Sequence, residues 1–498
     1  MREGYTMLTS MPAYHLLLPL VLSLAGGLAV GLVKWKGRKS MLALAAAVLA
    51  ADLLVTVTVC LSPADLSLPL FSVTEELRVC FHADRLGRLF ALLFSFVWLM
   101  AGIAAFEYME HEKDNARFFC FYLIVGGVLN AACWAGNFFT YYILFELMTL
   151  TSMPLVLHSL SHEAVMAALK YLFYSMGGAF LTLFGLFLFM SQGESMTFAA
   201  GGSLAAGSLS GMQLAALFLM ILGFSTKAGM FPMHGWLPTA HPVAPAPASA
   251  VLSGVITKAG VLGVIRTVYY VAGPDRLRGT WVQTAWIVLT LITVFMGSMM
   301  AYQEDLLKKR MAYSTVSQVS YVLFGLSLLH PVAFTGALLH VVFHSLVKDT
   351  LFLSAGAVIV RTGRTRVREL AGVGKVMPVT MWCFTLVSVT LIGIPPASAF
   401  VSKWYLAVGA LETGIPIVRW LGPVILLVSA LLTAGYLLTI SIRAFLPDKS
   451  EMDLPPERCE AGWRMTVPML VMTALSVGLG VWPGPLLDTV NALAGLLF

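Results

Sequence analysis

Two lysines, Lys227 and Lys258, lie deep inside segments that are otherwise apolar enough to cross a lipid bilayer. An ammonium group at the centre of a bilayer costs about 2.5–3.5 kcal/mol even on the most lenient scale, so a helix bundle keeps one only where water or a partner reaches it. The segment between the lysines contains several prolines and two histidines: Pro232, Pro238, Pro242, Pro245, Pro247, His234 and His241. This pattern is typical of a membrane protein that moves charge, and we expect both histidines to support the path.

A carboxyl group, Glu146, lies in the middle of another apolar segment. One interpretation is a neutral carboxyl group that is hydrogen-bonded to a hydroxyl, and the other is a pair with Lys227. A nearby carboxylate favours the charged lysine, whereas desolvation favours the neutral amine. A Glu146–Lys227 pair would therefore release a proton when Glu146 moves away or is protonated.

Three titratable residues, His340, His344 and Lys348, recur every four positions within one apolar segment. This spacing places all three on one face of a helix. A single buried histidine is usually a core residue, but three stacked titratable groups indicate a relay. The alternative is a polar packing seam that Ser345 completes.

Prolines predict that two helices are broken. Pro232 follows Lys227, and Pro395 and Pro396 precede Lys403. Proline removes a backbone donor and clashes with the preceding turn, so each helix should unwind there. Interrupted helices at matching positions of two inverted halves point to a transport path. The alternative is a simple kink at each proline, with Lys403 snorkelling to a helix end.

The composition is that of an all-α polytopic membrane protein. Of the 498 residues, 59% are hydrophobic and 11% are charged, against about 25% charged residues in soluble domains. Apolar runs of about twenty residues, each long enough to cross a bilayer as a helix, predict about fourteen spans. They cover residues 11–33, 40–62, 86–106, 116–134, 138–158, 164–190, 211–232, 244–272, 281–301, 312–329, 332–360, 377–408, 418–445 and 465–488.

The spans are organised into four parts: N-terminal helices at 1–110, a first inverted repeat at 111–275, a second at 276–446 and a last helix at 447–498. Basic residues concentrate in alternate loops, which places those loops in the cytoplasm and both termini outside. The first span should remain as an uncleaved anchor. Six cysteines without a C-x-x-C pair or a Cys/His cluster argue against a metal or iron–sulfur site.

The segment that begins at Lys227, KAGMFPMHGWLPTAHPVAPAPASAVLSG, resembles the antiporter-like membrane subunits. This family is shared by respiratory complex I, multi-subunit cation/proton antiporters and membrane-bound energy-converting hydrogenases. The run KRMAYSTVSQ at 309–318 adds to the resemblance, which covers nearly the whole chain and is densest over 137–405. It implies fourteen helices with two inverted five-helix repeats. It also places the family's functional residues on Glu146, Lys227, Lys258 and Lys403.

Two features depart from the family pattern. Asp349 follows Lys348 where the family is more apolar, and the chain ends soon after its last span. The long lateral helix of the largest complex I subunit is therefore not expected. This favours the D-type antiporter subunit or its relatives in complex I and hydrogenases.

The leading hypothesis is a proton-translocating subunit of a prokaryotic plasma-membrane complex, with other membrane subunits as partners. Protons would enter near Lys227 and Glu146, pass Lys258 and the two histidines of the 332–360 span, and leave through Lys403, titrating as a coupled set. The same polar path could carry sodium ions. We expect no cofactor, metal, catalytic residue or nucleic-acid partner on this chain, so any oxidoreductase activity would belong to partner subunits. The alternatives are a self-contained carrier for a small solute and an inert membrane scaffold.

Overall fold

A computed structural model describes residues 11–74, 77–447 and 457–498 of the chain. Eleven of the described helices are long and apolar enough to cross a membrane. The other predicted spans are helical too: α2 (Leu18–Leu32) is short, α14 (Leu307–Ser327) is polar, and one span is divided between α17 (Pro378–Ile392) and α18 (Ser398–Glu412). The all-α polytopic architecture predicted from the sequence is confirmed.

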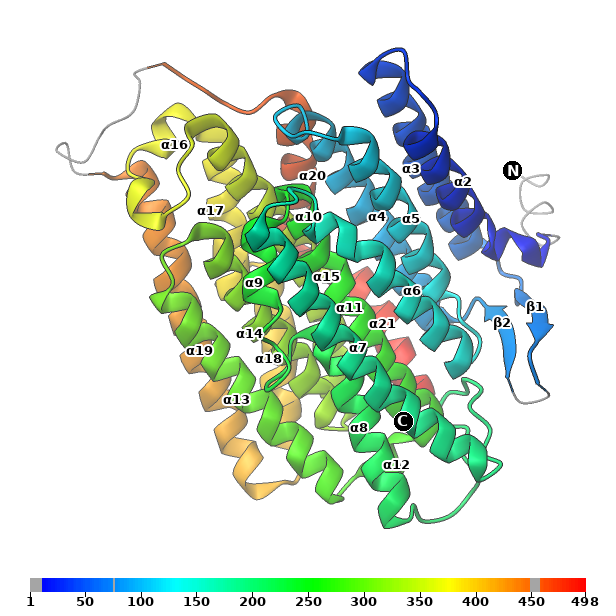
Figure 1. Cartoon of the computed structure of the whole chain (residues 1–498). Helices are drawn as coiled ribbons and strands as arrows, with labels where there is room; N and C mark the ends of the chain where they lie inside the picture. Colours follow the sequence, from blue (N-terminus) through cyan, green and yellow to red (C-terminus); the bar gives the residue numbers. More distant parts are fainter. Residues whose placement is uncertain (1–10, 75–76, 448–456) are drawn as a thin grey trace.

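The N-terminal part contains a small sheet that the sequence analysis did not predict. The 3-10 helix η1 (Ala13–Leu16), α2 and α3 (Arg38–Leu61) come first, and α4 (Arg85–Tyr108) follows the sheet. Strands β1 (Ser67–Ser72) and β2 (Arg78–His82) pair antiparallel, with Ser67 opposite His82. This hairpin lies at one end of the bundle, beside the ends of α3 and α4 (Figure 1).

The first repeat contains a helix that breaks at Gly229. Its helices are α5 (Asn115–Cys133), α6 (Phe138–Val156), α7 (His162–Ser191), α8 (Gly211–Ala228), the short α9 (Leu237–Val243) and one long segment made of α10 (Ala246–Val251), η2 (Leu252–Ile256), α11 (Thr257–Ile265) and η3 (Arg266–Ala272). Gly229 ends α8 with a φ of 84°, a left-handed conformation that glycine adopts without a steric penalty. The chain then turns through Pro232 before α9 begins, so the predicted break is confirmed.

The second repeat breaks in the same way. Its helices are α13 (Trp281–Gln303), α14, α15 (Pro331–Thr362), α17, α18 and α19 (Pro416–Phe445), with the short α12 (Pro274–Leu277), η4 (Val367–Glu369) and α16 (Val373–Val376) in the connections. Gly393 ends α17 with a φ of 89°, and α18 begins two residues after Pro396. The chain closes with α20 (Trp463–Val481) and a further helix, α21 (Gly484–Leu497), that the sequence analysis did not predict.

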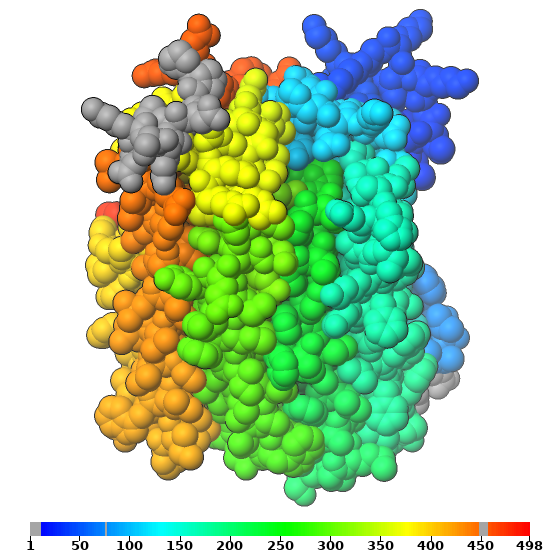
Figure 2. Space-filling view, turned by 60° about the vertical axis from the view of Figure 1, so that its left-hand side comes forward, coloured from blue at the N-terminus to red at the C-terminus, as the bar shows by residue number. Residues whose placement is uncertain are grey.

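The centre of the bundle is formed by the α10–η3 segment and by α15. In the most apolar window of each, 100% and 94% of the residues are buried. Neighbouring parts of the chain lie side by side across the molecule, with the second repeat towards the left of Figure 2 and the first repeat towards the right. The helices that carry Lys258, His340, His344 and Lys348 are therefore the ones shielded best from lipid.

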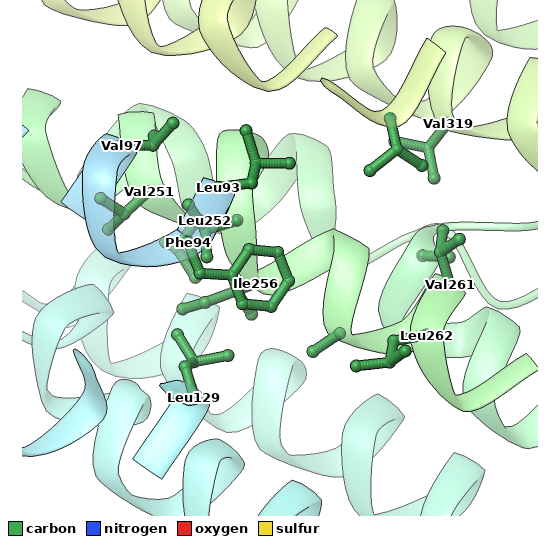
Figure 3. Packing of buried hydrophobic residues seen from close by; sticks show 14 of the residues in the cluster. Leu93, Phe94, Val97, Leu129, Val251, Leu252, Ile256, Val261, Leu262 and Val319 are labelled. Atoms are coloured by element: carbon green, nitrogen blue, oxygen red, sulfur yellow. The ribbon is translucent and has the colours of Figure 1, made fainter. Parts of the chain in front are cut away.

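Apolar side chains of the N-terminal helices pack directly on the central segment. Figure 3 shows this cluster, in which residues of α4 and α5 meet residues of α10 and η2: Leu93, Phe94, Val97, Leu129, Val251, Leu252 and Ile256. Such packing keeps lipid away from the central segment, so its polar groups find their partners within the protein.

Candidate functional site

Lys227 is held by hydroxyl groups from two neighbouring helices. Its ammonium nitrogen donates to Thr149 Oγ1 on α6 at 2.9 Å, and to Tyr171 OH and Ser175 Oγ on α7 at 2.7 and 3.0 Å. The same nitrogen lies 4.2 Å from the centroid of the Tyr171 ring. These groups satisfy a fully buried ammonium without a carboxylate, and the carboxyl end of α8 adds a favourable dipole.

Glu146 and Lys227 make no direct hydrogen bond. Glu146 is half-buried on α6, and its Oε1 makes no hydrogen bond. Within the described residues, the hydrogen bonds of Lys227 go to hydroxyls and not to this carboxylate. Glu146 can therefore act on Lys227 only through space.

Lys258 contacts a π-helical turn on one side and α15 on the other. The turn η2 precedes it, and Lys258 Nζ donates to the main-chain oxygen of Ser253 at 2.6 Å. The same nitrogen lies 2.6 Å from Nδ1 of His344. A charged Lys258 donates to Nδ1, whereas a neutral amine accepts from a protonated Nδ1. The two arrangements differ by the movement of one proton.

His340 and His344 lie on one face of α15, as predicted, with ring centroids 6.0 Å apart. His340 Nδ1 is 2.9 Å from Ser402 Oγ on α18, and Nε2 is 3.2 Å from Gln318 Oε1 on α14. The Gln318 amide donates to Thr433 Oγ1 on α19 at 3.4 Å. His340 therefore joins three helices of the second repeat.

The hydrogen bonds continue from Thr433 to Lys348. Tyr436 OH donates to Thr433 at 3.3 Å and lies 2.7 Å from Ser314 Oγ, which accepts from Lys348 Nζ at 2.6 Å. Lys348 thus belongs to the same network as His340, but it is connected through α14 and α19 rather than directly along α15. By contrast, Ser345 donates to the main chain of its own helix, so it does not complete the polar seam considered from the sequence.

Lys403 lies on α18, just after the second break. Its ammonium nitrogen donates to the main-chain oxygens of Leu391 and Ile392 at 2.7 and 2.9 Å. These carbonyls end α17 and lack helical partners because the helix stops there. The Tyr321 ring lies between Lys403 and His340, 5.1 Å from the ammonium and 5.5 Å from the imidazole.

The histidines near the first break have few partners. His241 is fully buried, neither ring nitrogen makes a hydrogen bond, and the ring stacks on Phe352 at 4.7 Å. His234 lies in the break beside Phe231, and its Nδ1 makes no hydrogen bond. Lys308, which the sequence analysis did not single out, is nearly buried and donates to the main-chain oxygens of Pro242 and Ala244. This contact fixes the end of α9.

Lys227 and Lys258 lie on adjacent helices but extend in opposite directions. Gly260 packs so closely on α8 that a Cβ there would lie 3.0 Å from Lys227 Cβ. Lys227 reaches towards α6 and α7, whereas Lys258 reaches towards α15. Among the described residues, no chain of hydrogen-bonded side chains connects them. The site therefore consists of a first-repeat group around Lys227 and a larger group from Lys258 through the second repeat.

Within the described ranges, no group of three or more His, Cys, Asp and Glu residues is placed to hold a metal ion. The arrangement instead defines a class of protein: a helical membrane protein with two inverted repeats, two broken helices and a buried row of ionisable side chains. We call these side chains the buried row: Glu146, Lys227, Lys258, His340, His344, Lys348 and Lys403.

Comparison with known proteins identifies the family. The family model described as NADH:quinone oxidoreductase/Mrp antiporter, transmembrane, matches residues 135–433, and the chain belongs to this family. It is 32% identical over 415 residues to NADH-quinone oxidoreductase subunit N of Desulforudis audaxviator, covering 80% of this chain and 81% of that protein. It is 33% identical over 340 residues to hydrogenase-4 component B of Escherichia coli, covering 65% of this chain and 49% of that protein.

The fold is similar to that of a subunit in the structure of the Mrp complex from Dietzia sp. DQ12-45-1b. The two chains superpose with a TM-score of 0.86, and 97% of each is covered at 23% identity. The fold class expected from the resemblance is therefore confirmed.

Proposed function

We propose that this chain is the proton-translocating, antiporter-like membrane subunit of a multi-subunit complex. The observation that carries the proposal is the contact of Lys258 with His344, in a buried row that links the two inverted repeats. Charged groups inside a membrane bundle are costly and mark ion paths. The family to which the chain belongs, which includes subunits of quinone reductases and antiporters, supports the same function.

The first part of the path is the Lys227 group. A proton enters near Glu146 and Lys227, where Thr149, Tyr171 and Ser175 hold the ammonium. No hydrogen-bonded side chain of the described residues leads onward, so transfer to Lys258 requires water or movement of a lysine side chain. This step is the place where transport can be gated.

The second part of the path begins at the contact of Lys258 and His344, where a proton on Lys258 passes to Nδ1 of His344. The His340 ring lies 6.0 Å away between ring centroids, and Nε2 of His344 makes no hydrogen bond within the described residues. Transfer to His340 therefore requires water or movement of a ring. The next acceptor of the proton is Lys403, which lies at the break between α17 and α18 and contacts the Tyr321 ring. The hydrogen-bonded chain of Gln318, Thr433 and Tyr436 connects Lys348 to His340. Lys348 can therefore hold a charge beside the path.

The driving reaction belongs to partner subunits, which carry out redox chemistry or cation exchange. We place the chain in the plasma membrane of a prokaryote, with the basic loops in the cytoplasm. Both termini then face outward, although the first ten residues lie outside the described part of the chain.

The test is the substitution Lys227→Ala in the assembled complex, reconstituted into proteoliposomes. Proton transport should fall at least about tenfold, since an ionisable group in the path is lost, while co-purification of the other subunits stays normal. Lys309→Gln is the matched control, because Lys309 is a half-exposed lysine in the first turn of α14 that pairs with Glu304. Undiminished transport by a correctly assembled Lys227→Ala complex would contradict the proposal.

The scaffold alternative makes a different prediction. If the chain only holds its neighbours together, a complex that lacks Lys227, Lys258 and Lys403 together will still couple its reaction to transport. A self-contained solute carrier would instead show uptake by the purified chain without other subunits.

A further inference from the structure

Asp349 is a buried carboxyl group whose oxygens have no hydrogen-bond partner. The residue lies on α15, directly after Lys348, with an exposed fraction of 0%. Neither Oδ1 nor Oδ2 makes a hydrogen bond. An ionised carboxylate in such a place is costly unless a cation faces it. The groups that surround Asp349 therefore determine whether its carboxyl group can ionise.

The packing of α15 against the central segment places Asp349 beside Lys258. Gly254 is so close that a Cβ there would lie 2.1 Å from Asp349 Oδ1. One helical turn further along, Lys258 contacts His344. Because Gly254 and Lys258 are four residues apart, they share a helix face, and this face meets both Asp349 and His344.

Glycine at position 254 is what admits the carboxyl group. Any larger residue would occupy the space of Oδ1, so the close approach depends on two residues at once: glycine at position 254 on η2 and an acid at position 349 on α15. Lys258 donates to the carbonyl of Ser253, the residue next to Gly254. Lys258 and Asp349 also lie within electrostatic range of one another.

The other titratable groups around Asp349 are mostly basic. His344 and Lys348 lie on its own helix, His241 on α9 stacks on Phe352 of α15, and Tyr122 on α5 lies within electrostatic range. Lys348 is engaged by Ser314 and the main chain of Met311. Lys258 is the cation whose charge acts on this carboxyl group.

We propose that Asp349 is the proton-exchanging partner of Lys258, so that the centre of the row is an acid–base pair and not a lone lysine. In the exchange, an N–H bond of the Lys258 ammonium breaks and an O–H bond forms on Asp349. The product is a neutral amine beside a carboxylic acid. The total charge of the pair is unchanged by this exchange, so the internal step separates no charge in the most deeply buried part of the bundle. The role in transport rests on the proposed function, but the pairing itself can be measured independently.

Infrared spectroscopy of the assembled complex tests the pairing directly. The carbonyl band of the protonated Asp349 side chain is assigned as the band that Asp349→Asn removes. With Lys258 present, this band should change intensity as pH is varied. In Lys258→Met the cation is gone, so Asp349 should stay protonated and its band should persist at every pH. A band that behaves identically with and without Lys258 would overturn the proposal.

Transport provides the second readout. Asp349→Asn should lower proton transport by about tenfold or more, because an opposite charge within about 4–6 Å changes proton binding by at least that factor. Gly254→Ala, which displaces the carboxyl group, should resemble Asp349→Asn. Asp52→Asn is the control, since Asp52 is also a buried acid but is hydrogen-bonded to Ser23 in the N-terminal helices.

The outcomes separate this inference from the proposed function. If Lys227→Ala and Lys258→Met both leave transport intact, the proposed function fails. If both abolish transport but Asp349→Asn behaves like wild type in both readouts, the Asp349 inference alone fails.

Discussion

The ammonium nitrogen of Lys258 and Nδ1 of His344 lie 2.6 Å apart, with both side chains fully buried. Lys258 belongs to the first repeat and His344 to the second. The two halves of the protein therefore meet through a contact that one proton can cross. Hydrogen bonds also hold two other lysines of the buried row. Hydroxyl groups accept from Lys227, and main-chain carbonyls at the end of α17 accept from Lys403.

The hydroxyl of Tyr171 should be required for normal proton binding at Lys227. Tyr171→Phe removes the shortest of the three hydrogen bonds to the ammonium, and a bond to a charged group contributes about 1.5–3 kcal/mol. We expect proton transport in proteoliposomes to fall about tenfold or more. Tyr174→Phe, one turn further along α7, should leave transport unchanged, and equal effects of the two substitutions would argue against this role.

Gln318 should connect His340 to the Thr433–Tyr436–Lys348 chain. Gln318→Leu keeps the volume but removes the acceptor for His340 and the donor to Thr433. Transport should slow, while co-purification of the complex stays normal. Ser320→Ala is a suitable comparison, because the Ser320 hydroxyl on the same helix is buried without a partner. A wild-type transport rate for Gln318→Leu would show that these hydrogen-bonded side chains do not belong to the proton path.

Close packing of α7 on α8 should be required to position the Lys227 group. A Cβ at Gly223 would lie 2.4 Å from the main-chain oxygen of Gly178, so Gly223→Ala must push the helices apart. Overpacking of this kind costs about 1–3 kcal/mol, and the shift also moves Tyr171 and Ser175. Thermal unfolding in detergent should occur at lower temperature. Gly177→Ala, whose added Cβ would meet nothing within 4 Å, should unfold at no lower temperature than wild type, because alanine favours the helix more than glycine does. The same loss in both variants would show that close packing at Gly223 is not responsible.

An ion pair outside the buried row should make stability depend on pH. Asp84 precedes α4 and accepts from Arg266 at 2.5 and 2.8 Å. Burial opposes ionisation of Asp84, but the charge and hydrogen bonds of Arg266 and the N–H of Gly87 outweigh it, so the pKa of Asp84 lies below its usual value. Such a carboxyl group stabilises the fold above its unfolded pKa of about 3.9. This contribution is lost as pH falls through the lower folded pKa.

Asp84→Asn tests this ion pair. The buried Arg266 would lose its partner, which costs about 3–5 kcal/mol, so the variant should unfold at lower temperature at pH 7. The unfolding temperature of Asp84→Asn should also fall less than that of wild type when the pH is lowered, because the contribution of ionised Asp84 is already absent. The exposed Asp65 offers a control, and an unfolding temperature for Asp84→Asn equal to that of Asp65→Asn at pH 7 would contradict the assignment.

The sequence predicted those features that depend on a single helix. Helical spacing places His340 and His344 on one face, and proline chemistry places the breaks at Pro232 and after Gly393. These features follow from local geometry, so one segment is enough to predict them. The apolar length of each span similarly predicted the number of crossings.

The partners of the buried row could not be predicted in this way. Tyr171 and Ser175 lie 56 and 52 residues from Lys227, and only packing of α7 on α8 brings them together. The sequence left open whether Glu146 pairs with Lys227 for the same reason, since opposite charges on two predicted helices do not fix which side chains meet. The π-helical turn at Leu252–Ile256 carries no simple sequence signal, yet it presents the Ser253 carbonyl to Lys258.

The most direct test of the account is proton transport by the assembled complex in which Lys258 is replaced by methionine. Methionine fills similar volume but cannot carry a proton, so transport should fall to the background level of protein-free liposomes while the complex assembles normally. Lys309→Gln, measured in parallel, should transport at the wild-type rate. Wild-type transport by Lys258→Met would show that protons do not pass through the centre of the buried row.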